Sequence, residues 1–131
     1  MVIVDTSVLV DFINGVTNPE TQWLDFELER QRFALTTPIL TEVLLGVRNE
    51  REAELISSEL RRFEIFELHD RGLAVDAARN YRYLRNARHT VRKTVDLLIA
   101  TYCIRHQHSL LHRDRDFDAF EKLLGLTVIH P

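Results

Sequence analysis

The sequence is poor in the residues that disulfide-rich, fibrous and membrane-spanning proteins need. It contains one cysteine, Cys103, and only three prolines and four glycines in 131 residues. A single cysteine cannot form an internal disulfide, so nothing in the composition requires an oxidising compartment. No apolar run approaches the ~20 residues that a membrane-spanning helix needs. The apolar N-terminal stretch contains Asp5 and lacks a basic leader segment, so we expect no signal peptide and a cytoplasmic protein without membrane attachment.

The composition is that of one globular domain. Hydrophobic residues make up 45% of the chain and charged residues 28%, which is enough for one core without disulfide or metal cross-links. We therefore expect residues 1–131 to form a single domain. The net charge is −3, yet six basic residues and no acidic residue fall between Arg79 and Lys93. A basic segment on an acidic body is an asymmetry typical of proteins with an anionic partner.

Short apolar segments alternate with helical patterns along the chain. The pattern predicts strands at 1–4, 33–35, 63–68, 109–111 and 126–129, and helices ending near 13, 32, 47, 62, 86, 106 and 124. This alternation predicts an α/β sandwich, with a small and mostly parallel central sheet flanked by helices. Ligands of such sheets bind at the carboxyl ends of the strands.

Several helix starts are predicted from residues whose side chains cap helices. Asn18 and Thr37 each precede a proline, which is favoured at the first helical position. Thr94 is expected to cap a later helix, and Thr6 or Ser7 is expected to cap the first one. Each cap predicts the residue at which the backbone turns into a helix.

Five acidic residues lie beside apolar core sequence. They are Asp5 at the end of the first strand, Glu42 within a helix, Asp96 in the first turn of another helix, and Asp114 and Asp116 after a later strand. Carboxylates at the strand ends of one small sheet converge, and they cannot all stay ionised unless a cation lies among them. Hard divalent cations such as Mg²⁺ or Mn²⁺ suit oxygen ligands and phosphodiester hydrolysis, because a cation lowers the pKa of a bound water.

Taken singly, each acid also has a structural explanation, because a strand-end aspartate commonly caps a helix. A phosphatase with an aspartyl-phosphate intermediate would need a second aspartate two residues after Asp5, where Ser7 stands. A receiver domain would need a lysine near the last strand, and none is suitably placed there. The set of acids, rather than any one of them, therefore points to a metal site.

Four motifs in order resemble those of PIN-domain nucleases, and most of all the VapC-type toxins of bacterial toxin–antitoxin pairs. The motifs are Val2-Ile3-Val4-Asp5-Thr6-Ser7-Val8-Leu9, Thr41-Glu42-Val43 before Leu45-Gly46, Asp96-Leu97-Leu98-Ile99-Ala100 and Asp114-Arg115-Asp116-Phe117. Their order and spacing match the family across essentially the whole chain. The resemblance implies a PIN-like α/β fold and a Mg²⁺- or Mn²⁺-dependent endoribonuclease that cleaves structured RNA such as tRNA or rRNA.

The resemblance also assigns residues and partners. It implies that the acidic site residues are Asp5, Glu42, Asp96 and either Asp114 or Asp116, and that Thr6 and Ser7 orient the first carboxylate or a metal-bound water. It implies inhibition by a small VapB-type antitoxin, frequent homodimers, and heterotetramers or larger assemblies with the antitoxin. The competing interpretation is an inactive RNA-binding or regulatory PIN module. Loss of an acid would favour that alternative, but all the acidic positions are filled.

Two positions depart from the family pattern. His112 stands where the family usually has threonine, so it is expected to orient Asp114, to contact phosphate, or only to replace a hydroxyl hydrogen bond. Glycine is common where Ala87 or a neighbour stands, so the loop before Asp96 is expected to have a different shape. Neither change removes an acidic residue.

The basic segment offers candidate contacts to RNA or to an antitoxin. Those nearest to Asp96 are Arg88, His89, Arg92 and Lys93, and His112 is a further candidate. Phosphate contacts by such residues would make binding salt-dependent. The alternative is a solvated helix face whose cations lie near its C-terminal end, where the helix dipole favours them.

Two further groups are expected to be structural. Cys103, His106 and His108 have a ligand-like spacing but no partner motif, so we expect core and helix-end residues rather than a zinc site. Trp23 and Phe26 either stack on a splayed base or pack in the core or a dimer interface, and packing is the expected role.

Overall fold

The computed structural model describes all residues from Met1 to Pro131. Five strands form one sheet: β1 (Val2–Val4), β2 (Phe33–Thr36), β3 (Glu64–Phe66), β4 (Ser109–Leu111) and β5 (Thr127–Val128). Every neighbouring pair is parallel, and the strand order is β3-β2-β1-β4-β5. The predicted α/β fold with a parallel sheet is confirmed.

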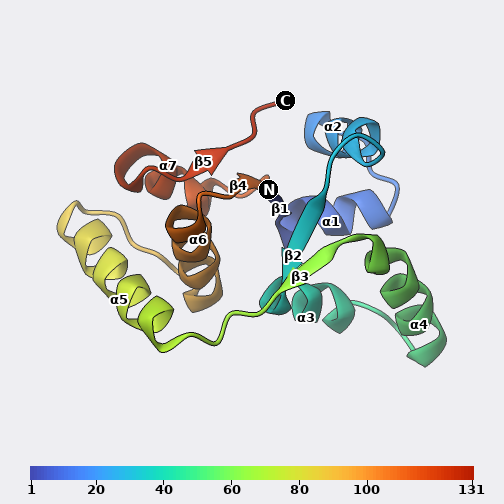
Figure 1. Ribbon diagram of the computed structural model, residues 1–131, viewed down its shortest axis with the longest axis horizontal. Helices are drawn as coiled ribbons and strands as arrows, with labels where there is room; N and C mark the ends of the chain where they lie inside the picture. The colour runs from blue at the N-terminus through green and yellow to red at the C-terminus, as the bar shows by residue number, and fades with distance from the viewer.

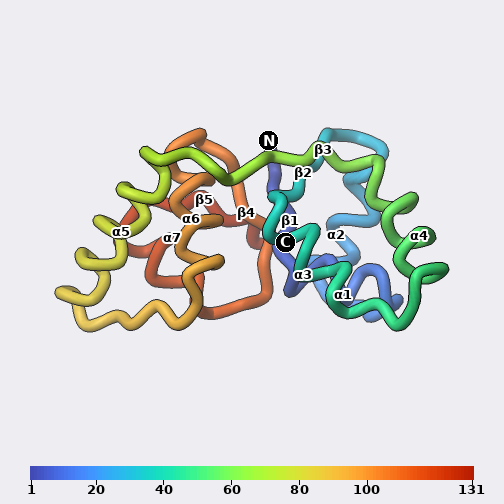
Figure 2. Tube along the Cα trace, turned by 90° about the horizontal axis from the view of Figure 1, so that it is seen from below, coloured from blue at the N-terminus to red at the C-terminus, as the bar shows by residue number.

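Seven α-helices flank this sheet. They are α1 (Thr6–Ile13), α2 (Pro19–Glu27), α3 (Thr37–Leu45), α4 (Glu50–Glu59), α5 (Arg71–Asn86), α6 (Thr94–His106) and α7 (Asp118–Leu124), with short 3₁₀ helices at Leu60–Arg62 and Arg115–Phe117. Figures 1 and 2 show α1 to α4 on one side of the molecule and α5 to α7 on the other, with β1 and β2 between them. This arrangement is the three-layer sandwich that the alternation of elements predicts.

None of the helices combines the length and the apolar character that crossing a bilayer requires.

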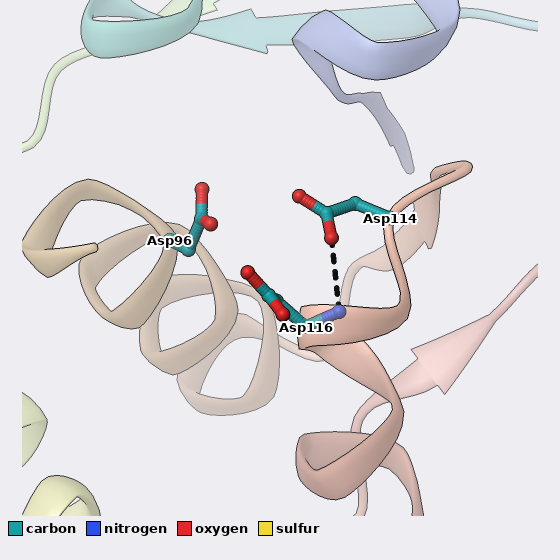
Figure 3. Close-up of side chains that lie close together, drawn as sticks. All are labelled: Asp96, Asp114 and Asp116. Atoms are coloured by element: carbon teal, nitrogen blue, oxygen red, sulfur yellow. Dashed lines mark hydrogen bonds between the residues drawn. The ribbon is translucent and has the colours of Figure 1, made fainter. Parts of the chain in front are cut away.

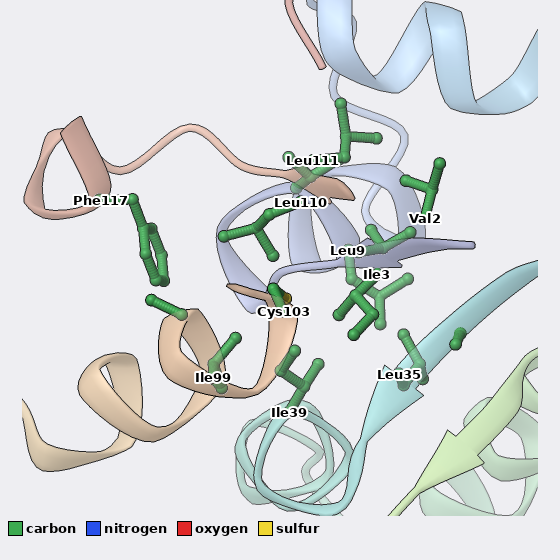
Figure 4. Close-up of a cluster of buried hydrophobic side chains, with 14 of the residues drawn as sticks. Val2, Ile3, Leu9, Leu35, Ile39, Ile99, Cys103, Leu110, Leu111 and Phe117 are labelled. Atoms are coloured by element: carbon green, nitrogen blue, oxygen red, sulfur yellow. The ribbon is translucent and has the colours of Figure 1, made fainter. Parts of the chain in front are cut away.

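The central strands β1 and β2 are apolar except for Thr36 at the end of β2, because helices cover both of their faces. Every residue of β1 and β2 is buried, so their sequences show continuous apolar runs instead of alternation. Ile3, Leu35 and Leu110 are fully buried in one core cluster, together with Leu9 and Ile99 from the flanking helices (Figure 4). Burying one such side chain contributes about 1.5–3 kcal/mol. This core holds the strand ends in a fixed relation to each other.

The strand order reverses between β1 and β4, and this reversal positions the candidate site. The chain passes from β1 outward to β2 and β3, then crosses back to β4 and β5 on the other side. Val4 at the end of β1 pairs with Leu111 at the end of β4, and the Asp5 N–H donates to the Leu111 carbonyl at 2.9 Å. A parallel sheet has its ligand crevice at such a switch point, beyond the carboxyl ends of the strands.

Helix starts differ from the sequence predictions at three sites, of which the first two are in α1 and α3. Asp5, not Thr6 or Ser7, is the N-cap of α1, and its side chain accepts the Ser7 N–H. Thr36 rather than Thr37 caps α3. In both cases the cap is the last residue with extended backbone, because a capping side chain must precede the first helical turn. The first carboxylate of the candidate site therefore also begins a helix.

The start of α6 differs as well. Thr94 is its first helical residue, and Lys93 occupies the cap position without a side-chain cap hydrogen bond. Asn18 caps α2 as predicted, in a reciprocal capping box with Thr21. No side chain therefore caps the end of α6 that carries Asp96.

Candidate metal centre

Three aspartates lie together beyond the ends of β1 and β4. One carboxylate oxygen from each of Asp96, Asp114 and Asp116 lies within 4.8 Å of the other two. Asp96 projects from the first turn of α6, and Asp114 and Asp116 face it from the segment that follows β4 (Figure 3). The structure therefore gathers both acids of the last motif, although the sequence analysis left the choice between them open.

Asp96 is the most buried residue of the three. Its residue is only 5% exposed, and its Oδ2 atom is buried without a hydrogen-bond partner. Burial, together with the negative charges of Asp5, Asp114 and Glu42, raises the pKa of Asp96 to about 7 against the opposing charge of Lys93. A buried carboxylate oxygen without a partner, placed among other carboxylates, is suited to bind a cation.

Asp5 lies beside this group rather than within the 4.8 Å cluster. It is 4% exposed, and its Oδ2 accepts hydrogen bonds from the Ser7 N–H at 3.1 Å and the Ser7 hydroxyl at 2.6 Å. Burial raises the pKa of Asp5, while the Ser7 hydrogen bonds lower it. The Oδ2 atom of Asp5 is thus held by two hydrogen bonds from its own helix.

Glu42, like Asp5, lies outside the aspartate cluster. It lies half-buried on α3, outside the 4.8 Å cluster, and its Oε1 accepts the Thr6 hydroxyl at 3.1 Å. Thr6 therefore orients Glu42 rather than the first carboxylate, whereas Ser7 orients Asp5. The two hydroxyl residues after Asp5 therefore donate hydrogen bonds to two different acids.

The segment after β4 is fixed by side chains that bind its backbone. The Ser7 Oγ accepts the Arg113 N–H at 3.0 Å, the His112 Nδ1 accepts the Asp114 N–H at 3.1 Å, and the Asp114 Oδ1 accepts the Asp116 N–H at 2.9 Å. The Arg113 side chain also pairs with Glu20 of α2 at 2.6 Å. Arg113 and Glu20 were not singled out from sequence, because nothing in local spacing indicates a contact between residues so far apart in the chain.

Ser7→Ala is expected to loosen both sides of the site at once. The variant loses the donor to Asp5 and the acceptor of the Arg113 N–H, so we expect the free energy of unfolding to fall by about 1–3 kcal/mol. Mn²⁺ affinity should fall about 10-fold, as for other residues that orient ligands. Urea unfolding and isothermal calorimetry measure the two effects. The exposed Ser58→Ala on α4 is the control, and equal behaviour of the two variants would contradict the linking role of Ser7.

The predicted basic contacts lie on an exposed loop between α5 and α6. Arg88, His89, Arg92 and Lys93 are all exposed, and none of them takes part in an ion pair. Lys93 immediately precedes α6, and its charge acts on Asp96. His112 is only 9% exposed, which favours the orienting role among those considered for it.

The remaining sequence candidates have structural positions. Cys103 is fully buried in the core, and burial raises the pKa of its thiol to about 12. His106 packs against Tyr102, with ring centroids 4.4 Å apart. Trp23 packs edge-to-face on Phe33 at 5.8 Å. Phe26 is 58% exposed, with the guanidinium of Arg30 over its ring.

The donor set fits a hard divalent cation. The clustered atoms are carboxylate oxygens, with no thiolate or imidazole among them, and such atoms suit Mg²⁺ or Mn²⁺. A cation among them would also offset the mutual repulsion that raises the pKa of Asp96. A cation held by carboxylates beyond the ends of parallel strands suits chemistry on phosphate esters.

Comparison with known proteins places this arrangement in a family. The family model for the PIN domain matches residues 2–123. Ribonuclease VapC11 of Mycobacterium tuberculosis is 32% identical over 134 aligned residues, which cover 98% of this chain and 97% of the relative. A VapC ribonuclease of Mycobacterium bovis matches with the same identity and coverage.

Solved structures share the fold. FitAcB from Neisseria gonorrhoeae superposes with a TM-score of 0.76 at 22% identity, over 100% of this chain and 98% of that one. VapBC2 from Rickettsia felis, bound to a DNA fragment from its promoter, gives 0.75 at 18% identity over 98% of both chains. A toxin–antitoxin complex from Klebsiella pneumoniae gives 0.74 at 18% identity, over 100% of this chain and 98% of that one. At these identities the likeness concerns the fold.

Proposed function

This chain belongs to the PIN-domain family and to its VapC group, and on that premise we propose that it is a metal-dependent endoribonuclease toxin neutralised by a cognate antitoxin. The observation that carries the proposal is the cluster of Asp96, Asp114 and Asp116 beyond the strand ends. The names of the ribonuclease relatives support RNA as the substrate. The proposal treats residues 1–131 as one domain, which the single core cluster supports.

In this proposal three of the acids bind the metal ion, and the other two lie around it. Asp96, Asp114 and Asp116 hold Mg²⁺ or Mn²⁺, and Asp5 and Glu42 complete the acidic surroundings under the control of Ser7 and Thr6. The cation supplies neutralisation of phosphate charge and acidification of the attacking water. Without a cation the five acids also repel the RNA backbone, because carboxylates and phosphates carry charges of the same sign.

The basic loop is proposed to receive the RNA phosphates. Arg88, His89, Arg92 and Lys93 have no competing acidic partner, and Lys93 adjoins the acidic cluster. Arg88 adopts a left-handed backbone with φ of 67°, a conformation that costs a non-glycine residue about 1–2 kcal/mol. Arginine is less stable than glycine at this backbone position. We therefore propose that the guanidinium of Arg88 serves in binding and not in stability.

Arg88→Gly is therefore expected to have opposite effects on stability and on binding. The free energy of unfolding should rise by about 1 kcal/mol, because glycine adopts this backbone without strain. RNA affinity should fall, and the slope of log K against log salt should decrease by about 0.7 for each phosphate that the variant no longer neutralises. Chemical denaturation and RNA titrations over a salt series, in an Asp96→Asn background, measure both effects.

Arg88→Ala separates charge from strain, because it removes the cation but keeps the left-handed backbone. It should bind RNA as weakly as Arg88→Gly without the gain in stability. Arg51→Ala, at an exposed position on α4, controls for net charge. An unchanged salt slope in both Arg88 variants would show that Arg88 does not touch RNA.

A protein partner is supported by the unburied apolar residues around α4. No residue of α4 is fully buried, Leu55 is 60% exposed, and Leu45 at the end of α3 is 78% exposed. The two leucines lie on α3 and α4, which contact each other, and exposed apolar side chains on neighbouring elements are candidates for a protein interface. We propose a VapB-type antitoxin as the partner, a homodimer, heterotetramers or larger assemblies with the antitoxin, and a cytoplasmic location. An antitoxin reading frame directly upstream would distinguish a toxin from a housekeeping nuclease.

Cleavage of RNA by the purified protein is the direct test. The protein, freed of any antitoxin, is incubated with total bacterial RNA in Mn²⁺ or Mg²⁺, with EDTA reactions beside it. Discrete fragments that disappear with EDTA and in Asp5→Asn and Asp96→Asn are expected, whereas the exposed Asp25→Asn on α2 should cleave normally. Cleavage that survives both substitutions would reject the site. Intact RNA with a metal-bound protein, including RNA from the native host, would favour the alternative of an inactive RNA-binding or regulatory module.

A further inference from the structure

His112 accepts a hydrogen bond from the backbone of a candidate metal ligand. It follows β4 directly and is 9% exposed, and its ring packs against Phe117 with centroids 4.9 Å apart. Its Nδ1 atom accepts the backbone N–H of Asp114 at 3.1 Å. The ring is thus held by packing on one side and by the backbone of a candidate metal ligand on the other.

The hydrogen bond also defines the tautomer of the ring. Since Nδ1 is the acceptor, the neutral imidazole carries its proton on Nε2. The Nε2 atom is buried and has no hydrogen-bond partner, and an unpartnered buried donor is a net cost. The Nε2 atom of His112 thus makes no hydrogen bond, and the only hydrogen bond of the ring is the one that Nδ1 accepts.

The Nδ1 acceptor controls two of the three clustered carboxylates. It binds the Asp114 N–H, and the Asp114 Oδ1 in turn binds the Asp116 N–H at 2.9 Å. The Ser7 hydroxyl oxygen accepts the N–H of Arg113, the residue between His112 and Asp114. Without the His112 acceptor, the Asp114 N–H would have no partner, and the backbone that sets both carboxylates against Asp96 would be free to turn.

We propose that His112 is the positioning residue of the metal centre, acting through its Nδ1 atom on the Asp114 backbone. The inference rests on the proposed metal-dependent function, and it assigns to His112 no contact with RNA, antitoxin or cation. What the position requires is a short side chain with an acceptor about as far from Cα as Nδ1. Asparagine meets that requirement with its Oδ1 atom, whereas glutamine places its polar group nearer to the Nε2 position and leucine has none.

Mn²⁺ titration of three variants tests the proposal without relying on catalysis. His112→Leu and His112→Gln should bind Mn²⁺ about 10- to 100-fold more weakly than the native protein, the usual loss when a ligand-orienting residue is removed. His112→Asn should restore the affinity to within about threefold. Calorimetry gives the dissociation constants, and circular dichroism establishes that each variant is folded. If His112→Leu does not fold, the comparison of asparagine with glutamine still decides.

Amide hydrogen exchange supplies a second readout that packing alone would not change selectively. The Asp114 amide should be protected in the native protein and in His112→Asn, and should exchange faster in His112→Gln and His112→Leu. Equal affinities and equal exchange for asparagine and glutamine would overturn the proposal.

Asp96→Asn separates this proposal from the metal site itself. If Asp96→Asn loses Mn²⁺ while every His112 variant binds normally, only the role of His112 fails. If Asp96→Asn also binds normally, the metal centre fails and the proposed function fails with it.

Discussion

Asp96→Asn is expected to reduce RNA cleavage by about 10³-fold or more while making the metal-free protein more stable at pH 8. Asp96 is the buried member of the carboxylate cluster, and its Oδ2 atom has no hydrogen-bond partner. Asparagine occupies the same volume but lacks the charge that would bind the cation and organise the phosphate. It also removes a buried charge, and the pKa of Asp96 is raised first by that burial and then by repulsion from Asp5, Asp114 and Glu42.

The pH dependence of stability follows from the raised pKa. The pKa of Asp96 is 3.8 in an unstructured chain and about 7 in the folded protein. The folded state therefore holds its proton more tightly than the unfolded state, and the associated stability is full below pH 3.8 and is lost as the pH rises through 7. We expect a loss of about 1–3 kcal/mol across this window, after a discount for solvent screening at an open site. Asp96→Asn should not show this loss.

Urea unfolding in EDTA at a series of pH values measures the difference between the native protein and Asp96→Asn. The two curves should meet near pH 4 and separate toward pH 8, with the variant more stable. Mn²⁺ should then stabilise the native protein and not the variant, because only the native protein binds the ion. Asp25→Asn is the matched control on an exposed helix face. A variant less stable than the native protein at pH 8 would contradict the charge repulsion inferred here.

Asp114→Asn is expected to weaken Mn²⁺ binding more than Asp116→Asn does. Both residues belong to the cluster, but only Asp114 is among the charges that raise the pKa of Asp96. Asp114 also accepts the Asp116 N–H, and the amide oxygen of asparagine is a weaker acceptor than a carboxylate oxygen. We expect a loss of about 100-fold for Asp114→Asn and of about 10-fold for Asp116→Asn, with cleavage rates falling in the same order.

Calorimetric titration with Mn²⁺ and single-turnover cleavage of one RNA substrate test this order. The exposed Asp118→Asn, at the start of α7, is the control because it lies outside the cluster. A larger loss for Asp116→Asn would assign the principal ligand of the last motif to Asp116. Equal losses would mean that both carboxylates hold the ion with similar strength.

The positions of Asp5 and Asp114 could be predicted from the sequence because each comes after a short apolar segment that the pattern predicts as a strand. Parallel strands bring such residues to one edge of the sheet, and the pairing of Val4 with Leu111 does so here. The contacts that hold these acids could not be predicted in the same way. Ser7 binds the backbone of Arg113 across 106 positions of sequence, and no local pattern encodes a contact of that range.

Helix boundaries were predicted less well than helix positions. Asp5 and Thr36 took capping roles expected of their neighbours, because two adjacent residues can both cap and only tertiary packing decides between them. The helix expected to end near residue 32 ends at Glu27. These shifts are small, yet the first changes the chemistry, since Asp5 is both a helix cap and a member of the acidic surroundings.

The pairing of β1 with β4 determines when, during synthesis of the chain, the acidic cluster can form. Val2 pairs with Ser109, so the first strand waits for nearly the whole chain before its neighbour is synthesised. Contacts of such long range form late and slowly. At about 5–20 residues per second, a ribosome exposes Asp5 several seconds before Asp114. A nascent chain therefore lacks the complete carboxylate cluster, and the proposed metal site cannot form until translation is almost finished.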